Sequence, residues 1–210
     1  MRLALPKSRL LGSTERMLHE AGITFTGGSD RDYSPVTNMS WLEISIRKVR
    51  AIPQLIALGV CDAGFCGLDL VQDSAYEDVI PIFDTGLNPV TIVVAAAAKD
   101  EQILFHPPRR PIVIATEYEH LADQWAFRWN LAHIIIQTYG STEGYAPRDA
   151  DIVFDCVETG VTLEANGLVV LEEIMESSTY LIANRRVLES REKAREIEML
   201  QRRLAERSAT

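Results

Sequence analysis

The stretch "DIVFDCVETGVTLEANGL", residues 151–168, decides the fold. Its apolar run, Ile152 to Phe154, predicts a buried strand, and a polar loop follows directly. In open α/β folds such a loop stands at the carboxyl edge of the sheet, where ligands bind. Two acids, two hydroxyls and a glycine give the loop its polar character: Asp155, Glu158, Thr159, Gly160 and Thr162.

The residue types in this loop indicate a sugar-phosphate site. Gly160 lets the backbone turn tightly, and successive N–H groups in such a turn form an anion-binding concavity. Thr159 and Thr162 add hydroxyl donors. Asp155 and Glu158 would repel a bare phosphate, but they fit the diol of a sugar phosphate, or a phosphate that arrives with Mg²⁺. An ordinary strand-to-helix turn with a threonine cap is the alternative, and spacing alone does not decide between the two.

The composition is that of a soluble globular protein. The 210 residues are 47% hydrophobic and 24% charged, enough for one large domain or two small ones. The net charge of −9 argues against a nucleic-acid scaffold, and no apolar run approaches the ~18 residues of a membrane span. Three cysteines at unrelated spacings indicate reduced thiols in a cytoplasm, and neither they nor the histidines form a metal-binding pattern.

Short strands alternate with short helices along the chain, which predicts an α/β fold with mostly parallel sheets. Ser13 is expected to cap the first helix and Pro53 to lie in the first turn of the second. Residues 23–45 stay unassigned, and residues 168–184 are ambiguous between helix and strand. The expected strands cover 2–5, 61–67, 79–83, 90–98, 112–115, 133–138 and 151–157. The expected helices cover 13–21, 53–58, 68–73, 117–129 and 186–207.

Two of the extended segments are long enough to pass between two lobes. The strand at 90–98 and the segment at 168–184 would then join a first lobe, residues 1–88 plus 179–210, to a second lobe, residues 89–178. A ligand cleft is expected between them. An apolar stripe on the last helix, which includes Ile197 and Leu200, is expected to pack on the helix's own lobe.

Several motifs resemble one family. The loop reads D-x-x-x-T-G-x-T, the pattern with which phosphoribosyltransferases bind phosphoribosyl pyrophosphate. "VETGVTLEANGL" with "LEEIMESSTYLIANR", "LALPKSRLL", "GVCDAGFCGLDLV", "IATEYEHLA" and "GSTE" are similar, in order from residue 3 to residue 185, to segments of ATP phosphoribosyltransferase. The chain is thereby identified as a member of that family, in its short form.

The resemblance implies a fold, a reaction and partners. The fold would be that of type II periplasmic binding proteins, with two α/β lobes and a cleft between them. The reaction would join ATP to phosphoribosyl pyrophosphate, with Mg²⁺ carried by the substrate and no metal ligand assigned to the protein. The chain would be cytoplasmic and would form a homodimer that assembles with a regulatory subunit related to histidyl-tRNA synthetase.

The resemblance also implies roles for residues. Asp155 and Glu158 would accept hydrogen bonds from the ribose hydroxyls, and Lys7 and Arg9 would hold the pyrophosphate; these four are the expected catalytic residues. The loop expected to hold the phosphoribosyl pyrophosphate comprises Glu158, Thr159, Gly160, Val161, Thr162 and Leu163. The residues expected to bind ATP are Lys48, Gly67, Asp69 and Glu143.

The chain departs from the family pattern mainly at charged positions. Ala51 replaces a usual acid, Glu117 replaces a usual basic residue, and "NPVTIVV" at 88–94 lacks a usual arginine. Ser8 replaces a glycine. The alternative is therefore a catalytically weakened paralogue that binds a nucleotide or sugar phosphate as a regulatory or binding module. A relative of solute-binding proteins, whose loop holds no phosphate, is a third hypothesis.

Overall fold

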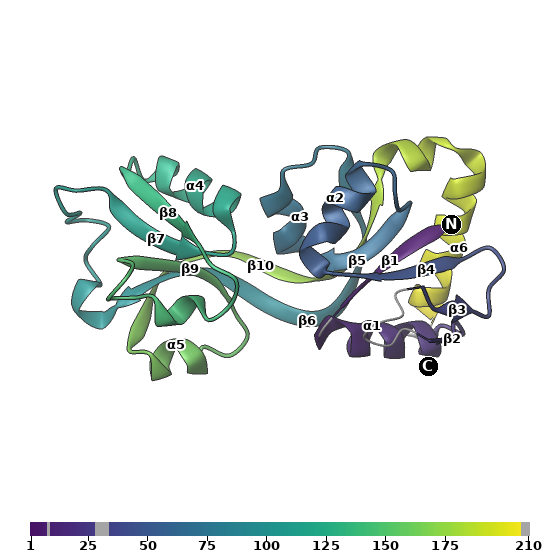
Figure 1. The fold of residues 1–210 in the computed structure, drawn as a ribbon, viewed down its shortest axis with the longest axis horizontal. Helices are drawn as coiled ribbons and strands as arrows, with labels where there is room; N and C mark the ends of the chain where they lie inside the picture. Colours follow the sequence, from purple (N-terminus) through teal and green to yellow (C-terminus); the bar gives the residue numbers. More distant parts are fainter. Residues whose placement is uncertain (8, 28–33, 207–210) are drawn as a thin grey trace. The chain divides into compact units, whose positions relative to one another are not determined.

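The structure is a computed structural model that describes residues 1–7, 9–27 and 34–206. The chain forms two compact units (Figure 1). Unit 1 consists of Met1–Asn88 and Ser178–Thr210, and unit 2 consists of Pro89–Ser177. Ser8, one of the departures from the family pattern, lies outside the described residues.

Unit 1 is built on a sheet in which β4 (Glu43–Arg47), β1 (Arg2–Pro6) and β5 (Ala63–Gly67) run parallel. The strand β10 (Leu168–Asn184) pairs with β5 in the antiparallel sense, so the order is β4-β1-β5-β10. A small second sheet pairs β2 (Phe25–Thr26) with β3 (Val36–Thr37), within the region that the sequence left unassigned. The helical segments are α1 (Arg9–Glu20), η1 (Val49–Ala51), α2 (Ile52–Ala57), α3 (Leu68–Ser74), η4 (Arg185–Glu189) and α6 (Arg191–Glu206).

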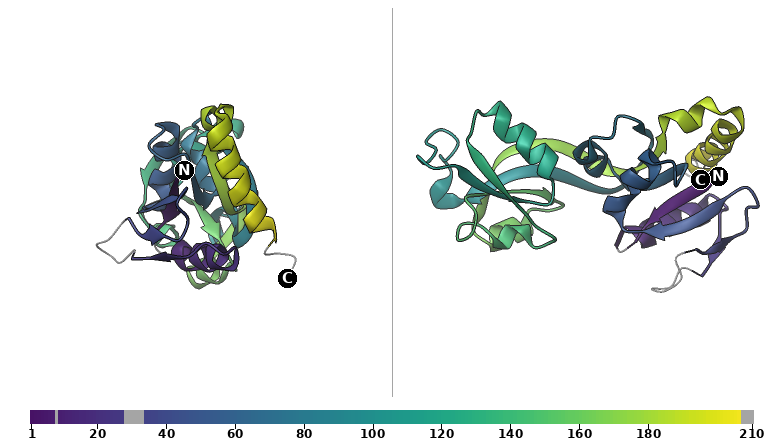
Figure 2. Two further views of the ribbon diagram at one scale, coloured as in Figure 1. Left: turned by 90° about the vertical axis from the view of Figure 1, so that its right-hand side faces the viewer. Right: turned by 45° about the horizontal axis from the view of Figure 1, so that its top comes forward.

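Helices cover both faces of this sheet. On one face, Ile52 and Ile56 of α2 and Val71 of α3 pack against Ala4 of β1 (Figure 1). The other face is covered by α1 and by α6, the yellow helix that lies along unit 1 in Figure 2. Ile197 of α6 is buried there, as the stripe on the last helix predicted. The nearly continuous apolar runs of β1 and β5 are explained by this double coverage.

Unit 2 holds the other half of the eight-stranded sheet, in the order β6-β9-β7-β8. Strands β9 (Ile152–Val157), β7 (Ile112–Thr116) and β8 (His133–Gln137) are parallel, and β6 (Val79–Ala97) pairs with β9 in the antiparallel sense. One face is covered by α4 (Glu119–Arg128) and the other by α5 (Val161–Ala165) (Figure 1). Two single turns, η2 (Ala98–Asp100) and η3 (Thr142–Gly144), complete the unit.

Side chains alternate between the two faces of the unit 2 sheet. Phe154 lies on the α4 face, where its ring centroid is 6.4 Å from that of the fully buried Trp125. Val153 and Val157 point to the opposite face, in a cluster that includes Leu163 of α5. By this alternation Asp155 also points to the α5 face. The sheet thus carries a carboxylate among apolar neighbours.

Two long strands connect the units. β6 crosses the boundary at Asn88 and β10 crosses it at Ser178. The expectation of two separate strands at 79–83 and 90–98 was wrong. Gly86 (φ 66°) and Asn88 (φ 51°) do depart from extended geometry, as turn residues would, yet the strand continues through them. The Asn88 amide is held by Thr179 of β10, to whose hydroxyl it donates a 3.0 Å hydrogen bond.

Three predicted helix starts also need correction. α1 begins at Arg9, so Ser13 lies inside the helix and its hydroxyl donates to the Leu10 carbonyl at 3.1 Å instead of capping. α4 begins at Glu119, which leaves Glu117 in the loop after β7. α6 begins at Arg191, because residues 185–189 form a separate 3-10 turn. The ambiguous segment 168–184 is strand.

Candidate functional site

The carboxyl edge of the unit 2 sheet gathers the most particular residues of the sequence. Three parallel strands end there, and Glu117 directly follows β7. Glu143 lies in η3, in the connection after β8. The loop Glu158–Gly160 follows β9 and leads into α5. Parallel strands bring their carboxyl ends to one edge, which is where open α/β sheets bind ligands.

The loop after β9 changes direction at one glycine, Gly160. Gly160 has a φ of 77°, a left-handed conformation that favours glycine, and no atom lies within 4 Å of where its Cβ would be. Backbone conformation, not crowding, therefore requires glycine here. The N-cap position of α5 is Gly160, so no threonine occupies that position.

The predicted loop residues differ in exposure. Glu158, Thr159, Val161 and Thr162 are exposed, and Gly160 is half-buried. Leu163 is buried and packs in the core of unit 2 against the α5 face of the sheet. Leu163 therefore anchors the loop to the core through its side chain.

Asp155 is held in an unfavourable environment for a charge. Burial raises its pKa, the nearby Glu143 and Glu117 carboxylates raise it further, and the result is a pKa of about 6. Two hydrogen bonds to the carboxylate lower its pKa. The Cys156 backbone N–H donates to Asp155 Oδ1 at 2.8 Å, and the Thr142 hydroxyl donates to the carboxylate. Asp155 is thus a half-buried acid whose charge state changes near neutral pH.

A buried pair of hydroxyls supports Asp155. Thr138, just after β8, and Thr142 in η3 are both buried, with 2.7 Å between their Oγ1 atoms. Because Thr142 has one hydroxyl proton and gives it to Asp155, Thr138 is the donor to Thr142. Sequence reasoning missed this relay, although the quoted motif "GSTE" contains Thr142.

The carboxyl edge of the unit 1 sheet gathers the other predicted residues. Lys7 directly follows β1 and its N–H donates to the Arg47 carbonyl at 2.6 Å. The register pairs Pro6 with Arg47 and Ala4 with Gly64. Lys48 directly follows β4 and Gly67 ends β5, the two strands that flank β1. Arg9 is exposed at the start of α1.

Gly67 and Asp69 form a close local pair at this edge. A Cβ on Gly67 would clash with Asp69 Oδ1, so glycine leaves room for that carboxylate in its present position. Asp69 itself is buried in the first turn of α3. The structure therefore groups the predicted residues in two sets. Lys7, Arg9, Lys48, Gly67 and Asp69 belong to unit 1; Glu143, Asp155 and the loop 158–163 belong to unit 2.

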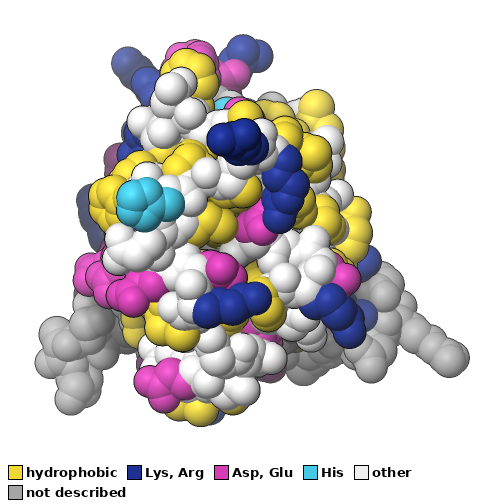
Figure 3. All heavy atoms as spheres, turned by 90° about the vertical axis from the view of Figure 1, so that its left-hand side faces the viewer, with side chains coloured by type: hydrophobic (Ala, Val, Ile, Leu, Met, Phe, Trp, Pro, Cys, Tyr) yellow, Lys and Arg dark blue, Asp and Glu magenta, His cyan; other side chains and the backbone are white. Residues whose placement is uncertain are grey.

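Local charge matters more than net charge for an anion site. Figure 3 shows lysine and arginine side chains scattered among acidic and hydrophobic ones over one face of the molecule.

Within the described ranges, no group of three His, Cys, Asp or Glu side chains has the geometry to hold a metal ion. No helix in that part of the chain is long and apolar enough to cross a membrane.

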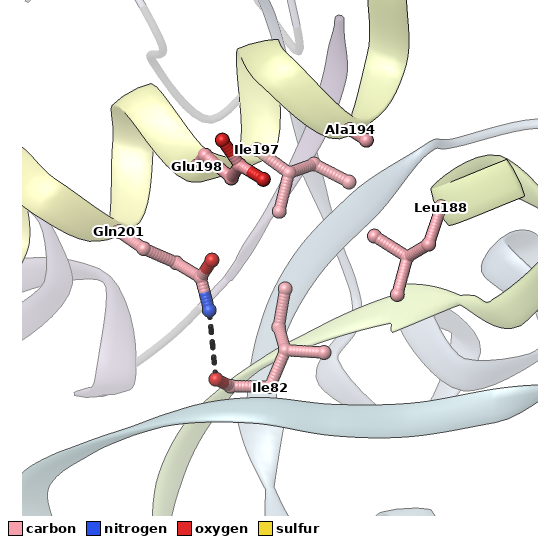
Figure 4. A pocket seen from close by; sticks show the side chains of 6 residues that line it. All are labelled: Ile82, Leu188, Ala194, Ile197, Glu198 and Gln201. Carbon is pink, nitrogen blue, oxygen red and sulfur yellow. Dashed lines mark hydrogen bonds between the residues drawn. The ribbon is translucent and has the colours of Figure 1, made fainter. Parts of the chain in front are cut away.

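A pocket of about 360 Å³ lies elsewhere in unit 1 (Figure 4). Its wall on α6 includes Ile197 and Gln201, and the Gln201 amide donates to the Ile82 carbonyl at 2.8 Å. None of its lining residues is a predicted site residue. Aliphatic side chains dominate the lining, so this pocket is a gap under α6 that does not suit a polyanion.

Comparison with solved structures first shows the structural class to which the fold belongs. The chain resembles the alkanesulfonate-binding protein SsuA from Xanthomonas axonopodis pv. citri bound to MOPS, with a TM-score of 0.56 and 12% identity over 99% of this chain and 72% of that one. It is therefore an α/β protein with the fold of periplasmic binding proteins, as predicted. A closer likeness is the ATP phosphoribosyl transferase (HisG:HisZ) complex from Thermotoga maritima. It has a TM-score of 0.84 and 25% identity, and the match covers 98% of this chain and 99% of that chain.

Sequence comparison identifies the family. The sequence model of HisG, ATP phosphoribosyltransferase, matches residues 48–206. The ATP phosphoribosyltransferase of Desulforudis audaxviator is 34% identical over 190 residues, which are 88% of this chain and 65% of that relative. The chain thus spans less than two thirds of that relative's length. It belongs to the ATP phosphoribosyltransferase family, and its match covers 99% of the chain in the Thermotoga complex to which it is similar.

Proposed function

We propose that this chain is an ATP phosphoribosyltransferase that transfers the phosphoribosyl group from phosphoribosyl pyrophosphate to N1 of ATP, the first step of histidine biosynthesis. The observation that carries the proposal is the loop Glu158–Leu163. It turns on Gly160 at the carboxyl edge of a parallel sheet, in a chain of this family. This position suits a phosphate held by backbone N–H groups.

The residues of unit 2 hold the phosphoribosyl group in this proposal. The backbone N–H groups of the loop and the hydroxyls of Thr159 and Thr162 donate to the 5′-phosphate. Asp155 and Glu158 accept hydrogen bonds from the ribose hydroxyls, for which Asp155 must be ionised. The Thr138–Thr142 relay keeps the Asp155 carboxylate in place. Glu143 faces the nucleotide.

In this proposal the residues of unit 1 bind the charged pyrophosphate and the nucleotide. Lys7 serves as a point charge and Arg9 as a fork for the pyrophosphate. Lys48, Gly67 and Asp69 bind ATP. As the adenine N1 attacks C1 of the ribose, the bond from C1 to the pyrophosphate oxygen breaks. The protein's contribution is to align the two substrates and to stabilise the charge that develops on the leaving group.

The proposal includes a cation and a partner. Mg²⁺ enters on the pyrophosphate and neutralises part of its charge. The related Thermotoga structure is a complex of HisG with HisZ, and we infer the same kind of assembly for this chain, as a homodimer with a regulatory subunit related to histidyl-tRNA synthetase. The site of action is the cytoplasm.

A turnover assay tests the proposal. The full chain, alone and with its partner subunit, is mixed with ATP, phosphoribosyl pyrophosphate and Mg²⁺, and ultraviolet absorbance follows phosphoribosyl-ATP. We expect product, and a loss of about 100-fold in kcat/KM for the double variant Thr159→Ala and Thr162→Ala, because two donors to the phosphate are removed. Thr26→Ala, an exposed threonine on β2, is the matched control. Absence of product with and without the partner would contradict the proposal.

A weakened paralogue is the second candidate, and Glu117 favours it. This acid stands where the family usually has a basic residue, and it raises the pKa of Asp155. A paralogue would bind phosphoribosyl pyrophosphate in calorimetry without turning it over, and Glu117→Lys would restore turnover. Robust activity of the natural chain would remove this candidate. Unchanged affinity in the loop double variant would instead favour the solute-binding hypothesis.

A further inference from the structure

The pocket under α6 has apolar walls that come from three elements of unit 1. They are formed by Ile82 of β6, Leu188 of η4, and Ala194 and Ile197 of α6. Figure 4 shows Ile82, Leu188 and Ile197 pointing towards one shared space. Its volume of about 360 Å³ lies at the lower end of the range of small-molecule pockets, about 300–1,000 Å³.

One polar group of the lining is held in a fixed orientation. The amide nitrogen of Gln201 donates to the Ile82 carbonyl at 2.8 Å, so the amide oxygen is turned away from that carbonyl (Figure 4). An amide oxygen accepts hydrogen bonds and donates none. The bond to β6 therefore fixes the end of the Gln201 amide that a ligand would meet as an acceptor.

The other polar group of the lining is a carboxylate. Glu198 is the exposed member of the lining, so its side chain lies at the mouth of the pocket. It precedes Gln201 by three residues on α6, a spacing that places both side chains on one face of the helix. Arg195 and Arg202 belong to the same helix, but in the described part of the chain Glu198 forms no ion pair with either. The mouth thus carries a negative charge that no side chain of the lining balances.

These groups select a ligand by charge and by shape. A hydrocarbon body fits the aliphatic walls, and a cationic donor fits the Glu198 carboxylate and the Gln201 oxygen. An anion would be repelled by Glu198, and an amino acid would bring its own carboxylate against the same charge. A sugar would place hydroxyl groups against aliphatic walls that offer them no partner.

We propose that this pocket binds a small aliphatic amine in its protonated form. The hydrocarbon body lies between β6, η4 and α6, and the ammonium group bonds to Glu198 and Gln201. An alkylamine is protonated at pH 7, as the lysine side chain is. Burial of about five carbons, together with one exposed ion pair, corresponds to a dissociation constant of about 1 mM.

A bound amine would hold the last helix on its own unit. It would contact α6, η4 and β6 at once, beside the bond that Gln201 already makes to the Ile82 carbonyl. A ligand that binds the folded chain alone raises its stability with concentration. The site lies apart from every residue that we assign to substrate binding, so amine binding does not depend on the proposed activity.

Three probes of equal chain length test the selectivity. The full chain is titrated at pH 7 and constant ionic strength with n-pentylamine, pentan-1-ol or pentanoate, and NMR follows its amide signals. We expect the amine to shift the signals of Ala194, Ile197 and Gln201 in a saturable way. The alcohol should bind about threefold more weakly and pentanoate at least about tenfold more weakly. Equal affinity of the three probes, or amine shifts confined to the acidic residues of unit 2, would overturn the proposal.

Three variants test the residues. Glu198→Gln should raise the dissociation constant of n-pentylamine about threefold, to that of the alcohol. The matched control is Glu192→Gln, which removes an exposed acid from the first turn of the same helix outside the pocket and should leave the constant unchanged. Ala194→Leu fills the space between the walls and should abolish the binding of both probes. Equal effects of the two glutamine variants, or undiminished binding in a folded Ala194→Leu chain, would overturn the proposal, as would no saturable binding of the amine to the natural chain.

Discussion

Two aspartates, one in each unit, show how neighbours decide the role of a carboxylate. Asp62 precedes β5 in unit 1 and is 3% exposed. Burial raises its pKa, but hydrogen bonds from the Arg2 backbone N–H (2.7 Å), the Arg2 guanidinium (3.2 Å) and Lys193 (3.1 Å) outweigh burial and hold the pKa below its usual value. Asp62 ties the last helix to the first strand.

Asp155 in unit 2 has the opposite surroundings. Burial raises its pKa to about 6, with the carboxylates of Glu143 and Glu117 nearby in place of cations. Its donors are the neutral Cys156 N–H and Thr142 hydroxyl. A buried charge that its own fold disfavours at neutral pH indicates function more than stability. The difference between the two residues separates a structural carboxylate from one that we propose to bind a ligand.

The largest expected effect is the loss of the Asp62 cluster. Asp62→Asn should lower the free energy of unfolding by about 3 kcal/mol at pH 7, because it leaves Lys193 and Arg2 without their buried counter-charge. Urea unfolding followed by circular dichroism measures it. Asp149→Asn, which removes an exposed pair with Arg148, is the control and should change stability by about 0.5 kcal/mol or less. A loss of unfolding free energy in Asp62→Asn no larger than that in Asp149→Asn would contradict the structural role of Asp62.

Asp155→Asn should raise the free energy of unfolding, whereas Asp62→Asn lowers it. The folded-state pKa of about 6 lies above the usual aspartate value, so ionisation costs the native state stability as the pH rises through 6. The amide carries no charge, and its oxygen still accepts from the Cys156 N–H. We expect it to stabilise the protein by about 2–3 kcal/mol at pH 8 and by little at pH 4. Equal stabilisation at both pH values would show that charge is not the cause.

The smallest expected effect on stability comes from replacing Glu117, an acid near Asp155. Glu117→Gln removes part of the repulsion on Asp155, so the midpoint of the Asp155 carboxyl titration, followed by carbon-13 NMR, should fall below about 6. Stability at pH 8 should rise by about 0.5 kcal/mol. Glu173→Gln, an exposed acid on β10, should leave the midpoint in place. A rise of the midpoint in Glu117→Gln would contradict the assigned repulsion.

Much of the fold followed from sequence because its signals are local. Apolar runs such as Ile112–Ala115 and punctuating residues such as Pro53 predict strands and helix starts directly. The long strand β6 was missed because Gly86 and Asn88 read as turn residues; the pairing with β10 that carries the chain through them is distant in sequence. Ser13 was misplaced because any serine near a helix start fits a cap.

The candidate site was predicted less completely. The sequence singled out the loop at 158–163 because glycine and two hydroxyls after a strand are an unusual combination. The buried Thr138–Thr142 pair was missed, because threonine after a strand is ordinary until the fold brings the two hydroxyls together and Thr142 to Asp155. Glu117 was noticed as a departure, yet its effect on the pKa of Asp155 depends on a proximity that only the folded sheet creates.

Calorimetric binding of phosphoribosyl pyrophosphate with Mg²⁺, at pH 8 and pH 5.5, tests most directly whether unit 2 holds the phosphoribosyl group through an ionised Asp155. For the natural chain we expect affinity to fall by about tenfold between the two pH values beyond the fall that the ligand's own phosphate causes, because protonation removes a charge-assisted acceptor. Asp155→Asn should bind about tenfold more weakly at pH 8 and show only the ligand's own pH dependence. The same pH dependence and the same affinity in both proteins would contradict the account.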